Sequence, residues 1–319
     1  MSRRQPFGHT ETQRFIVARD PLIESNVRIV PMTTIQNILF PVDFSPSCVG
    51  MAAFVKRSAA IFGARVTLLH VFDLYSHDAM QLYVRPPSEV AEEQRNLARD
   101  KLDSFLKSEF PPSDSRRVLL SGDAAVQITQ LARTNKFDLI ILPTHAGLFR
   151  RNLLGSTTAK VLNDADCPVL TTQHVETISP RRLEHREWVC AIGSDTDAER
   201  VLRYASQAAE AVHANLTLVH VIPASGSGLM IELDLEERQQ SAKREASSRR
   251  IEELQSTAGS RALVSIAIGP IKDMLTEEAR RLRADVLVIG RSPHFGVLGR
   301  SRDLSYALAR DAPCPVLSV

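Results

Sequence analysis

The sequence predicts an α/β protein made of two tandem domains, each with a parallel sheet of five strands sandwiched by helices. The first observation behind this prediction is a duplication. The apolar segment at residues 68–71 returns at residues 218–221, which places His70 and His220 at equivalent positions 150 residues apart. The second observation is that short apolar runs alternate with amphipathic helical patterns in both copies, as expected for parallel sheets covered on both faces.

The first copy begins after residues 1–34, which lack sustained periodicity and are expected to form a flexible N-terminal arm. Its first strand, residues 38–40, is followed by Ser45 as an N-cap, Pro46 at the first helical position and a helix closed by Gly63. The same patterns place the other elements of this domain, residues 35–173. Strands are expected at 66–72, 116–120, 139–142 and 169–172, and helices at 51–62, 88–107, 123–134 and after 156.

The second copy, residues 188–319, follows a linker at 174–187 that carries proline and arginine. Its strands are expected at 189–192, 216–222, 263–268, 286–289 and 316–319, and its helices at 198–212, 235–255, 271–282 and 304–310. The last strand of each copy would be an open sheet edge. Pairing the copies would cover both edges, which predicts an intramolecular pseudo-dimer, while a homodimer of chains is left open.

Composition excludes several classes of protein. The chain has 319 residues, 44% of them hydrophobic, and its 39 basic and 37 acidic residues give a net charge of +2. This balance argues against a dedicated nucleic-acid surface. No apolar run approaches the roughly 20 residues of a membrane span, and the start lacks the apolar core of a secretory signal. We therefore expect a cytoplasmic protein without a membrane partner.

Cysteines and strand histidines are expected to be structural. The cysteines show no CxxC spacing, and burial is favoured over metal binding or a disulfide: Cys48, Cys167, Cys190 and Cys314. His70 and His220 lie inside apolar strands, where a core residue with satisfied ring nitrogens is favoured over a ligand. For His145, after the fourth strand, a functional role and a loop-fixing role remain equally open.

A candidate binding site lies where strand ends of the first copy converge, because an open parallel sheet binds ligands beyond the carboxyl ends of its strands. The helix start at Gly155 is the phosphate candidate, since it combines close backbone approach with free N–H groups and the helix dipole. A simple helix cap is the alternative for this feature. The candidate residues are Pro41, Val42, Asp43, Val71, Leu142, Thr144, His145, Gly147, Gly155, Ser156, Thr157 and Thr158.

These segments, together with the Cys167-Pro168 motif that ends the first copy, resemble a universal stress protein domain, and the resemblance covers both copies. It implies a tandem universal stress protein with Rossmann-like, adenine nucleotide alpha hydrolase-like domains, whose nucleotide-binding members hold ATP. The resemblance implies that Asp43 and Val71 hold adenine. It further implies that ribose and phosphates are bound by Thr144, His145, Gly147, Gly155, Ser156 and Thr157. AMP or ADP in place of ATP, and a bound Mg²⁺, are left open.

The chain departs from the family pattern in the first copy. Pro143 replaces the first loop glycine and removes an N–H donor, and Ala146 replaces the second unless Gly147 takes over. The loop therefore offers fewer backbone donors for phosphate than the family pattern does.

The second copy departs further from the pattern. Gly193 stands where the first copy has Asp43, and Arg302-Asp303 stands where it has Gly155-Ser156. The base acceptor is lost, and a carboxylate at the helix start would repel phosphate. A different anion could meet Arg291, Arg300 and Arg302, but solvated arginines are the favoured interpretation.

The sequence thus predicts a cytosolic stress-response protein that binds an adenine nucleotide in its first domain and acts as a switch on a regulatory protein that the sequence does not identify. One alternative is a slow ATPase or self-phosphorylating protein, with Ser156 or Thr157 as the phosphate acceptor. The other is a nucleotide-free interaction scaffold. No general base, Walker A motif or metal-binding set stands beside Gly155, so no catalytic residue is assigned and at most weak hydrolysis or autophosphorylation is expected.

Overall fold

A computed structural model of the chain describes residues 35–73, 87–144, 154–173, 183–193, 197–223, 233–291 and 300–319. The predicted N-terminal arm, residues 1–34, and most of the predicted linker lie outside the described residues. The elements of the first domain are β1 (Asn37–Pro41), α1 (Pro46–Phe62), β2 (Arg65–Phe72), α2 (Pro87–Ser104), β3 (Ser115–Ser121), α3 (Ala124–Thr134), β4 (Leu139–Pro143), α4 (Ser156–Asp164) and β5 (Val169–Thr172).

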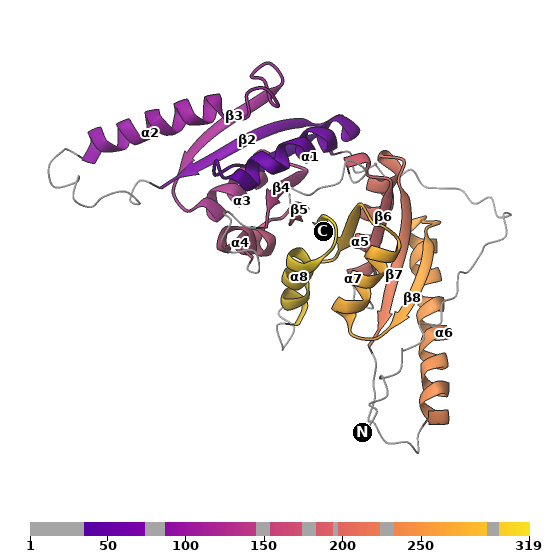
Figure 1. Ribbon diagram of the computed structural model, residues 1–319. Coiled ribbons are helices and arrows are strands. Elements are labelled where there is room, and N and C mark those ends of the chain that lie inside the picture. Colours follow the sequence, from indigo (N-terminus) through magenta and orange to yellow (C-terminus); the bar gives the residue numbers. More distant parts are fainter. Residues whose placement is uncertain are drawn as a thin grey trace, which may run out of the picture.

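The second domain repeats this order of strands and helices. Its elements are β6 (Glu187–Ala191), α5 (Ala198–Ala211), β7 (Asn215–Ile222), α6 (Leu233–Ala258), β8 (Leu263–Ile268), α7 (Ile271–Arg281), β9 (Val286–Ile289), α8 (Arg300–Asp311) and β10 (Val316–Ser318). The prediction of two tandem α/β domains is therefore confirmed. Figure 1 shows the two domains side by side, with α2 and α6 projecting at opposite ends of the molecule.

The strands form one sheet of ten, in the order β3-β2-β1-β4-β5-β10-β9-β6-β7-β8. Neighbours within each domain are parallel, whereas β5 and β10 pair antiparallel through Leu170 and Leu317. The two final strands thus cover each other's edges, as the pseudo-dimer prediction requires. In each domain the chain reverses direction across the sheet between its first and fourth strands, which is where such sheets bind ligands.

Local sequence signals explain how α1 begins and ends. Ser45 accepts a hydrogen bond from the backbone N–H of Cys48, Pro46 is the first helical residue, and Gly63 adopts a left-handed φ of 66° as the C-cap. The inward face of α1 packs Met51, Phe54 and their neighbours on a sheet whose central strands are buried. The carboxyl end of β1 is therefore held firmly against the start of α1.

The predicted helix at 88–107 ends earlier than expected, at Ser104. Arg117 on β3 explains this end, because its guanidinium donates hydrogen bonds to the carbonyls of Leu102, Phe105 and Phe110 at 2.9, 2.9 and 3.0 Å. Leu106 then turns the chain with a φ of 50°. A cation that satisfies the last carbonyls of a helix competes with further helical turns, and periodicity alone does not reveal it.

Each domain has one carboxylate, not singled out by the sequence analysis, at the end of its strands opposite the cavity edge. Asp138 Oδ2 accepts hydrogen bonds from the backbone N–H groups of Gln36 and Asn37, both at 2.9 Å. Asp285 does the same for Arg186 and Glu187 at 2.9 and 3.0 Å. Each carboxylate fixes the start of the first strand against the fourth, so it preserves the register on which the site at the other end depends.

The interpretation of Arg291 as a solvated arginine is wrong. Its guanidinium reaches into the first domain and donates to the carbonyls of Leu162 and Cys167, at 3.1 and 2.7 Å. Burial lowers its pKa. Tyr306 makes a similar contact, donating its hydroxyl to the carbonyl of Ala159 at 3.1 Å. The sequence could not reveal this because Arg291 follows a strand end that looks exposed until the other domain packs against it; the side chains of Arg300 and Arg302 lie outside the described residues.

Replacing Arg291 should weaken the junction between the domains. We expect Arg291→Met, which keeps an apolar stem but leaves two carbonyls without donors, to lower the free energy of unfolding by about 1–3 kcal/mol. Urea titration followed by circular dichroism measures this. Arg116→Met, at an exposed arginine on β3, should change stability by less than about 0.5 kcal/mol. Equal effects of the two substitutions would contradict a structural role for the Arg291 contacts.

The last residues of the predicted linker are anchored rather than free. His185 is fully buried, with its ring 5.3 Å from Phe54 and 6.1 Å from Trp188 between ring centroids. Its Nε2 lies 3.0 Å from Oγ of Ser58, and its Nδ1 has no hydrogen-bond partner within the described part of the chain. Burial, and then the nearby Arg57, lower the pKa of His185 from 6.5 to about 4. The ring is therefore neutral at pH 7.

This histidine should make stability depend on pH. Between pH 6.5 and 4 the unfolded chain binds a proton at residue 185 while the folded chain does not, so acidification over this range favours unfolding. The wild-type protein should lose free energy of unfolding as the pH falls over this range, and His185 contributes about 3 kcal/mol of that loss. We expect His185→Asn to make this pH dependence smaller. Asn tolerates the left-handed φ of 51° at this position. The matched control is His213→Asn, at an exposed histidine with a φ of 55°, and this variant should show the same dependence of stability on pH as the wild type. If His185→Asn also shows the wild-type dependence, His185 is not its source.

Candidate functional site

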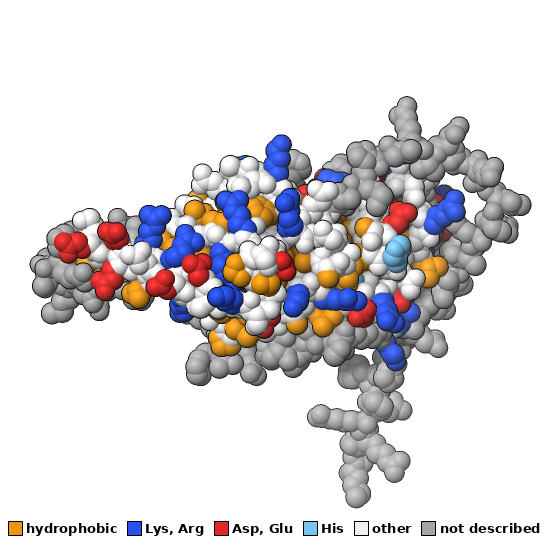
Figure 2. Space-filling view, turned by 90° about the horizontal axis from the view of Figure 1, so that it is seen from above, with side chains coloured by type: hydrophobic (Ala, Val, Ile, Leu, Met, Phe, Trp, Pro, Cys, Tyr) orange, Lys and Arg blue, Asp and Glu red, His pale blue; other side chains and the backbone are white. Residues whose placement is uncertain are grey.

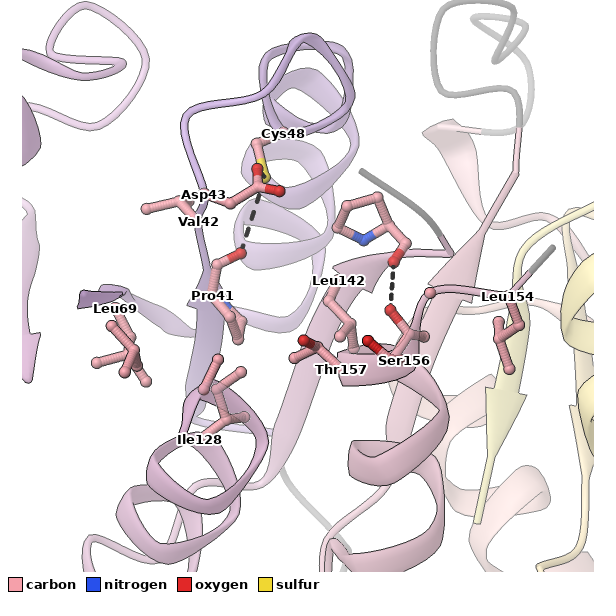
Figure 3. A pocket seen from close by; sticks show the side chains of 15 residues that line it. Pro41, Val42, Asp43, Cys48, Leu69, Ile128, Leu142, Leu154, Ser156 and Thr157 are labelled. Carbon is pink, nitrogen blue, oxygen red and sulfur yellow. Dashed lines mark hydrogen bonds between the residues drawn. The ribbon is translucent and has the colours of Figure 1, made fainter. Parts of the chain in front are cut away.

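A cavity of about 300 Å³ opens where β1 and β4 end, at the point where the strand order of the first domain reverses. Figure 3 shows that the labelled side chains around it come from β1, β2, β4 and the helices α1, α3 and α4. Its lining residues are Pro41, Val42, Asp43, Cys48, Leu69, Val71, Ala124, Ile128, Leu142, Pro143, Leu154, Gly155, Ser156, Thr157 and Thr158.

Most of the predicted site residues meet at this cavity. Those that line it are Pro41, Val42, Asp43, Val71, Leu142, Gly155, Ser156, Thr157 and Thr158. Thr144 does not line it, because its side chain is buried and donates a hydrogen bond to the carbonyl of Thr172 at 3.3 Å. His145 and Gly147 lie outside the described residues. Thr144 thus fixes the end of β4 to β5, and its predicted contact with a ligand has no support from its orientation.

Other lining residues were missed by sequence reasoning. The alternation of β2 gives one signal, since Leu69 lies two residues before Val71 and therefore on the same face of the strand. Ala124 and Ile128 are four residues apart on one face of α3, but the sequence does not say which face of this helix meets the cavity. Cys48 lies in the first turn of α1, next to the strand end that was singled out.

Asp43 presents its carboxylate with one oxygen already engaged. Its Oδ1 accepts hydrogen bonds from the backbone N–H of Ser45 at 2.9 Å and from the thiol of Cys48 at 3.1 Å. Burial, followed by the negative charge of Asp43, raises the pKa of the Cys48 thiol to about 12, so the thiol is protonated and acts as a donor. Among the described residues nothing bonds to Oδ2, which leaves this oxygen able to accept from a ligand.

The backbone that carries Asp43 is held in an unusual conformation. Phe44 has a φ of 64°, a left-handed value that non-glycine residues seldom adopt. Three contacts hold its ring, with the centroids of His70 and Phe105 at 4.1 and 5.1 Å and Nζ of Lys101 at 4.6 Å. Packing of α2 and β2 on this ring therefore fixes the turn that aims Asp43.

The strand histidines are satisfied structural residues, as predicted. Nδ1 of His70 donates to the carbonyl of Val42 at 2.8 Å, and Nδ1 of His220 donates to the carbonyl of Ile192 at the same distance. A carbonyl can only accept, so the proton lies on Nδ1 in both rings. Burial lowers the pKa of His70, which favours the neutral ring. Each histidine ties the second strand to the chain that leaves the first.

The other end of the cavity is the start of α4. Its N-cap is Gly155, which has no side chain to cap the helix, whereas Ser45 caps α1 and Asp123 caps α3. The N–H of Gly155 donates to the carbonyl of Thr144 at 2.7 Å, which closes the intervening loop. The first turn of α4 therefore presents backbone N–H groups and the positive end of the helix dipole to the cavity, an arrangement suited to an anion.

The second domain keeps a cavity of about 290 Å³ at the equivalent place but not its polar lining. Gly193 replaces Asp43, and among the lining residues that the structure describes Ser305 is the only side chain with a hydroxyl and none is charged. The side chain of Asp303 lies outside the described residues, so its predicted repulsion of phosphate stays a prediction.

Cysteine chemistry and charge distribution add few functional groups. All four cysteines are free; Cys48, Cys190 and Cys314 are buried and Cys167 is half-buried. The described residues contain no group of three or more His, Cys, Asp or Glu side chains suited to a metal ion, and no helix among them is long and apolar enough to cross a membrane.

Figure 2 shows Lys and Arg spread along one face with acidic side chains among them, and acidic side chains near the end occupied by α2.

Sheet order, duplication and the cavities at the reversal points define a class of tandem α/β proteins with one cavity in each repeat. The model of the universal stress protein family matches residues 34–173 and again residues 186–319. The chain therefore belongs to the universal stress protein family, as the sequence resemblance indicated.

The chain is also similar to individual proteins of known sequence or structure. A universal stress protein from Thermus aquaticus is 30% identical over 139 residues, which cover 42% of this chain and 96% of that protein. The crystal structure of a universal stress protein from Archaeoglobus fulgidus superposes with a TM-score of 0.63 at 19% identity, covering 90% of this chain and 96% of the other. A universal stress protein solved in complex with cAMP covers 44% of this chain and 98% of its own, at 18% identity and a TM-score of 0.31.

Proposed function

We propose that the first domain binds an adenine nucleotide, with ATP as the expected ligand and AMP or ADP as alternatives, and that the protein acts as a nucleotide-dependent regulatory switch in a stress response. One observation carries the proposal. A single cavity joins an outward carboxylate oxygen on Asp43 to the uncapped start of α4. The first can accept from the exocyclic amine of adenine, and the second can hold phosphate.

Size and lining support the same ligand. The cavity, at about 300 Å³, lies at the lower end of the range for small-molecule sites, which suits a base and ribose with phosphates extending to the rim. Apolar side chains of Leu69, Val71 and Ile128 line its interior and would contact the faces of a base. Bound Mg²⁺ would then be held mainly by the phosphates themselves, since Asp43 is the only carboxylate among the described lining residues.

A switch needs a physical link from the site to the rest of the molecule. Helix α4 offers one, because it begins at the cavity with Ser156 and carries, farther along, the carbonyls that accept from Tyr306 and Arg291 of the second domain. A phosphate bound at its first turn would act on a helix that both domains share. An ATPase is less favoured, because the described lining residues offer no general base near Ser156 or Thr157 and the Cys48 thiol is protonated.

The first test is the stoichiometry of binding and the role of Asp43. Calorimetric titration with ATP should give one site per chain. Asp43→Asn keeps an oxygen that can accept from Ser45 but turns the outward acceptor into a donor, so we expect ATP affinity to fall by about 1–3 kcal/mol with an unchanged melting curve. Asp114→Ala, at an exposed carboxylate before β3, is the control and should bind as the wild type does.

Several outcomes would contradict the proposal. Two equivalent sites per chain would refute the loss of function in the second domain, and unchanged affinity in Asp43→Asn would refute the adenine assignment. Mass spectrometry of nucleotide carried through purification gives an independent test. A chain that carries no nucleotide and shows no heat with ATP would be the interaction scaffold, while magnesium-dependent phosphate release would favour the ATPase.

The second test concerns Gly155. Its φ of −63° and ψ of 142° are open to any residue, so the turn itself does not require glycine. A side chain there should instead keep phosphate from the N–H groups of Ser156 and Thr157. We expect Gly155→Val to weaken ATP roughly tenfold or more, about 1.4 kcal/mol, while adenosine binds nearly as before. Parallel losses of ATP and adenosine would mean that the whole loop collapses and that no phosphate site exists at this helix.

A further inference from the structure

An ion pair at the rim of the first-domain cavity bridges the two helices on its phosphate side. Nζ of Lys160 on α4 lies 3.0 Å from Oδ2 of Asp123, the N-cap of α3. Asp123 immediately precedes Ala124, which lines the cavity. Lys160 follows the lining residues Ser156 and Thr157 by four and three positions, and therefore lies on the same face of α4. Lys160 is thus one helical turn farther along α4 than the residues proposed to meet phosphate.

The two partners are held very differently. Asp123 is fixed, because its Oδ1 accepts from the backbone N–H groups of Ala125 and Val126 at 3.0 and 3.1 Å. The hydrogen bond from Lys160 is the main cause that lowers the pKa of Asp123. The ammonium of Lys160 sits at the end of a flexible four-carbon stem, and the side chain is 58% exposed. An ammonium in this position can turn from one anionic acceptor to another at small cost.

The second domain argues against a purely structural role for this pair. At the offset of 147 residues that relates the two copies here, Ala307 replaces Lys160 and Pro270, the N-cap of α7, replaces Asp123. That domain ties α7 to α8 with a different pair, Lys272 and Asp311, at the far end of α8. Holding the two helices together therefore does not require charges at the cavity. The rim pair is absent from the same domain that lacks the carboxylate of Asp43.

We propose that Lys160 is the cationic ligand for the phosphates of the nucleotide, and that Asp123 holds it at the rim while the site is empty. This inference rests on the proposed function and deepens it. The lining residues that the structure describes contain no cation, and the helix dipole carries only a partial charge against the multiple charges of ATP. Lys160 supplies a full positive charge, and on binding its ammonium exchanges the carboxylate of Asp123 for a phosphate oxygen.

Two variants with opposite expected effects test this exchange by calorimetry. Lys160→Gln should weaken ATP about tenfold and leave adenosine unchanged, because only the phosphate contact is lost. Asp123→Asn keeps an N-cap that bonds the start of α3 but frees Lys160 and removes a repelling charge, so ATP should bind a few-fold more tightly. Lys272→Gln, which breaks the corresponding tie in the second domain, is the control and should not change ATP binding.

The outcomes separate this inference from the function on which it rests. A wild-type chain that binds neither ATP nor adenosine overturns both. If Lys160→Gln binds ATP as strongly as the wild type does, the role of Lys160 alone is overturned and the proposed function stays intact. If Asp123→Asn lowers the affinity for ATP as much as Lys160→Gln does, the ion pair only holds the two helices together. The proposed exchange of Asp123 for phosphate is then refuted. Opposite shifts, with adenosine unaffected in both variants, support it.

Discussion

The antiparallel pairing of β5 with β10 is the constraint on which the rest of the structure depends. Each domain alone would end in a short strand with unpaired N–H and C=O groups, and pairing these strands joins the two sheets into one of ten strands. The pairing also brings α4 and α8 together, so Tyr306 and Arg291 can reach carbonyls of the first domain. A junction made by main-chain bonds tolerates divergence of the side chains around it.

That tolerance explains how the two copies share one architecture and differ at their cavities. Features that hold the sheet persist in both domains: the carboxylates Asp138 and Asp285, and the histidines His70 and His220. Features that would contact a ligand persist in one, since Gly193 replaces Asp43 while the cavity keeps nearly the same volume. Structural groups are retained because each pairs with backbone donors or acceptors at a strand end, whereas a cavity can lose its polar lining without cost to the sheet.

Sequence reasoning could place the elements and much of the candidate site because both depend on local or topological rules. Ser45 and Gly63 mark the ends of α1 by their own chemistry, and Asp43 meets Gly155 because parallel strands end at a common edge. His185 and Arg291 could not be interpreted in this way. Their burial depends on Phe54 and on the end of α4, which the fold brings to them from distant parts of the sequence. Thr144 shows the same limit, because the direction of a side chain at a strand end is decided by its neighbour strand.

The arrangement around Phe44 holds the Asp43 end of the proposed site by more contacts than the α4 end has. Phe44, with its left-handed backbone, is held between His70, Phe105 and Lys101, so Asp43 has little freedom to move. At the other end the start of α4 has no side-chain cap and the cation at the rim is held by one exposed contact. A ligand would therefore be selected by its base at a fixed carboxylate. Its phosphates would be detected at a helix whose other contacts belong to the second domain, which is the order of events that a nucleotide-dependent switch requires.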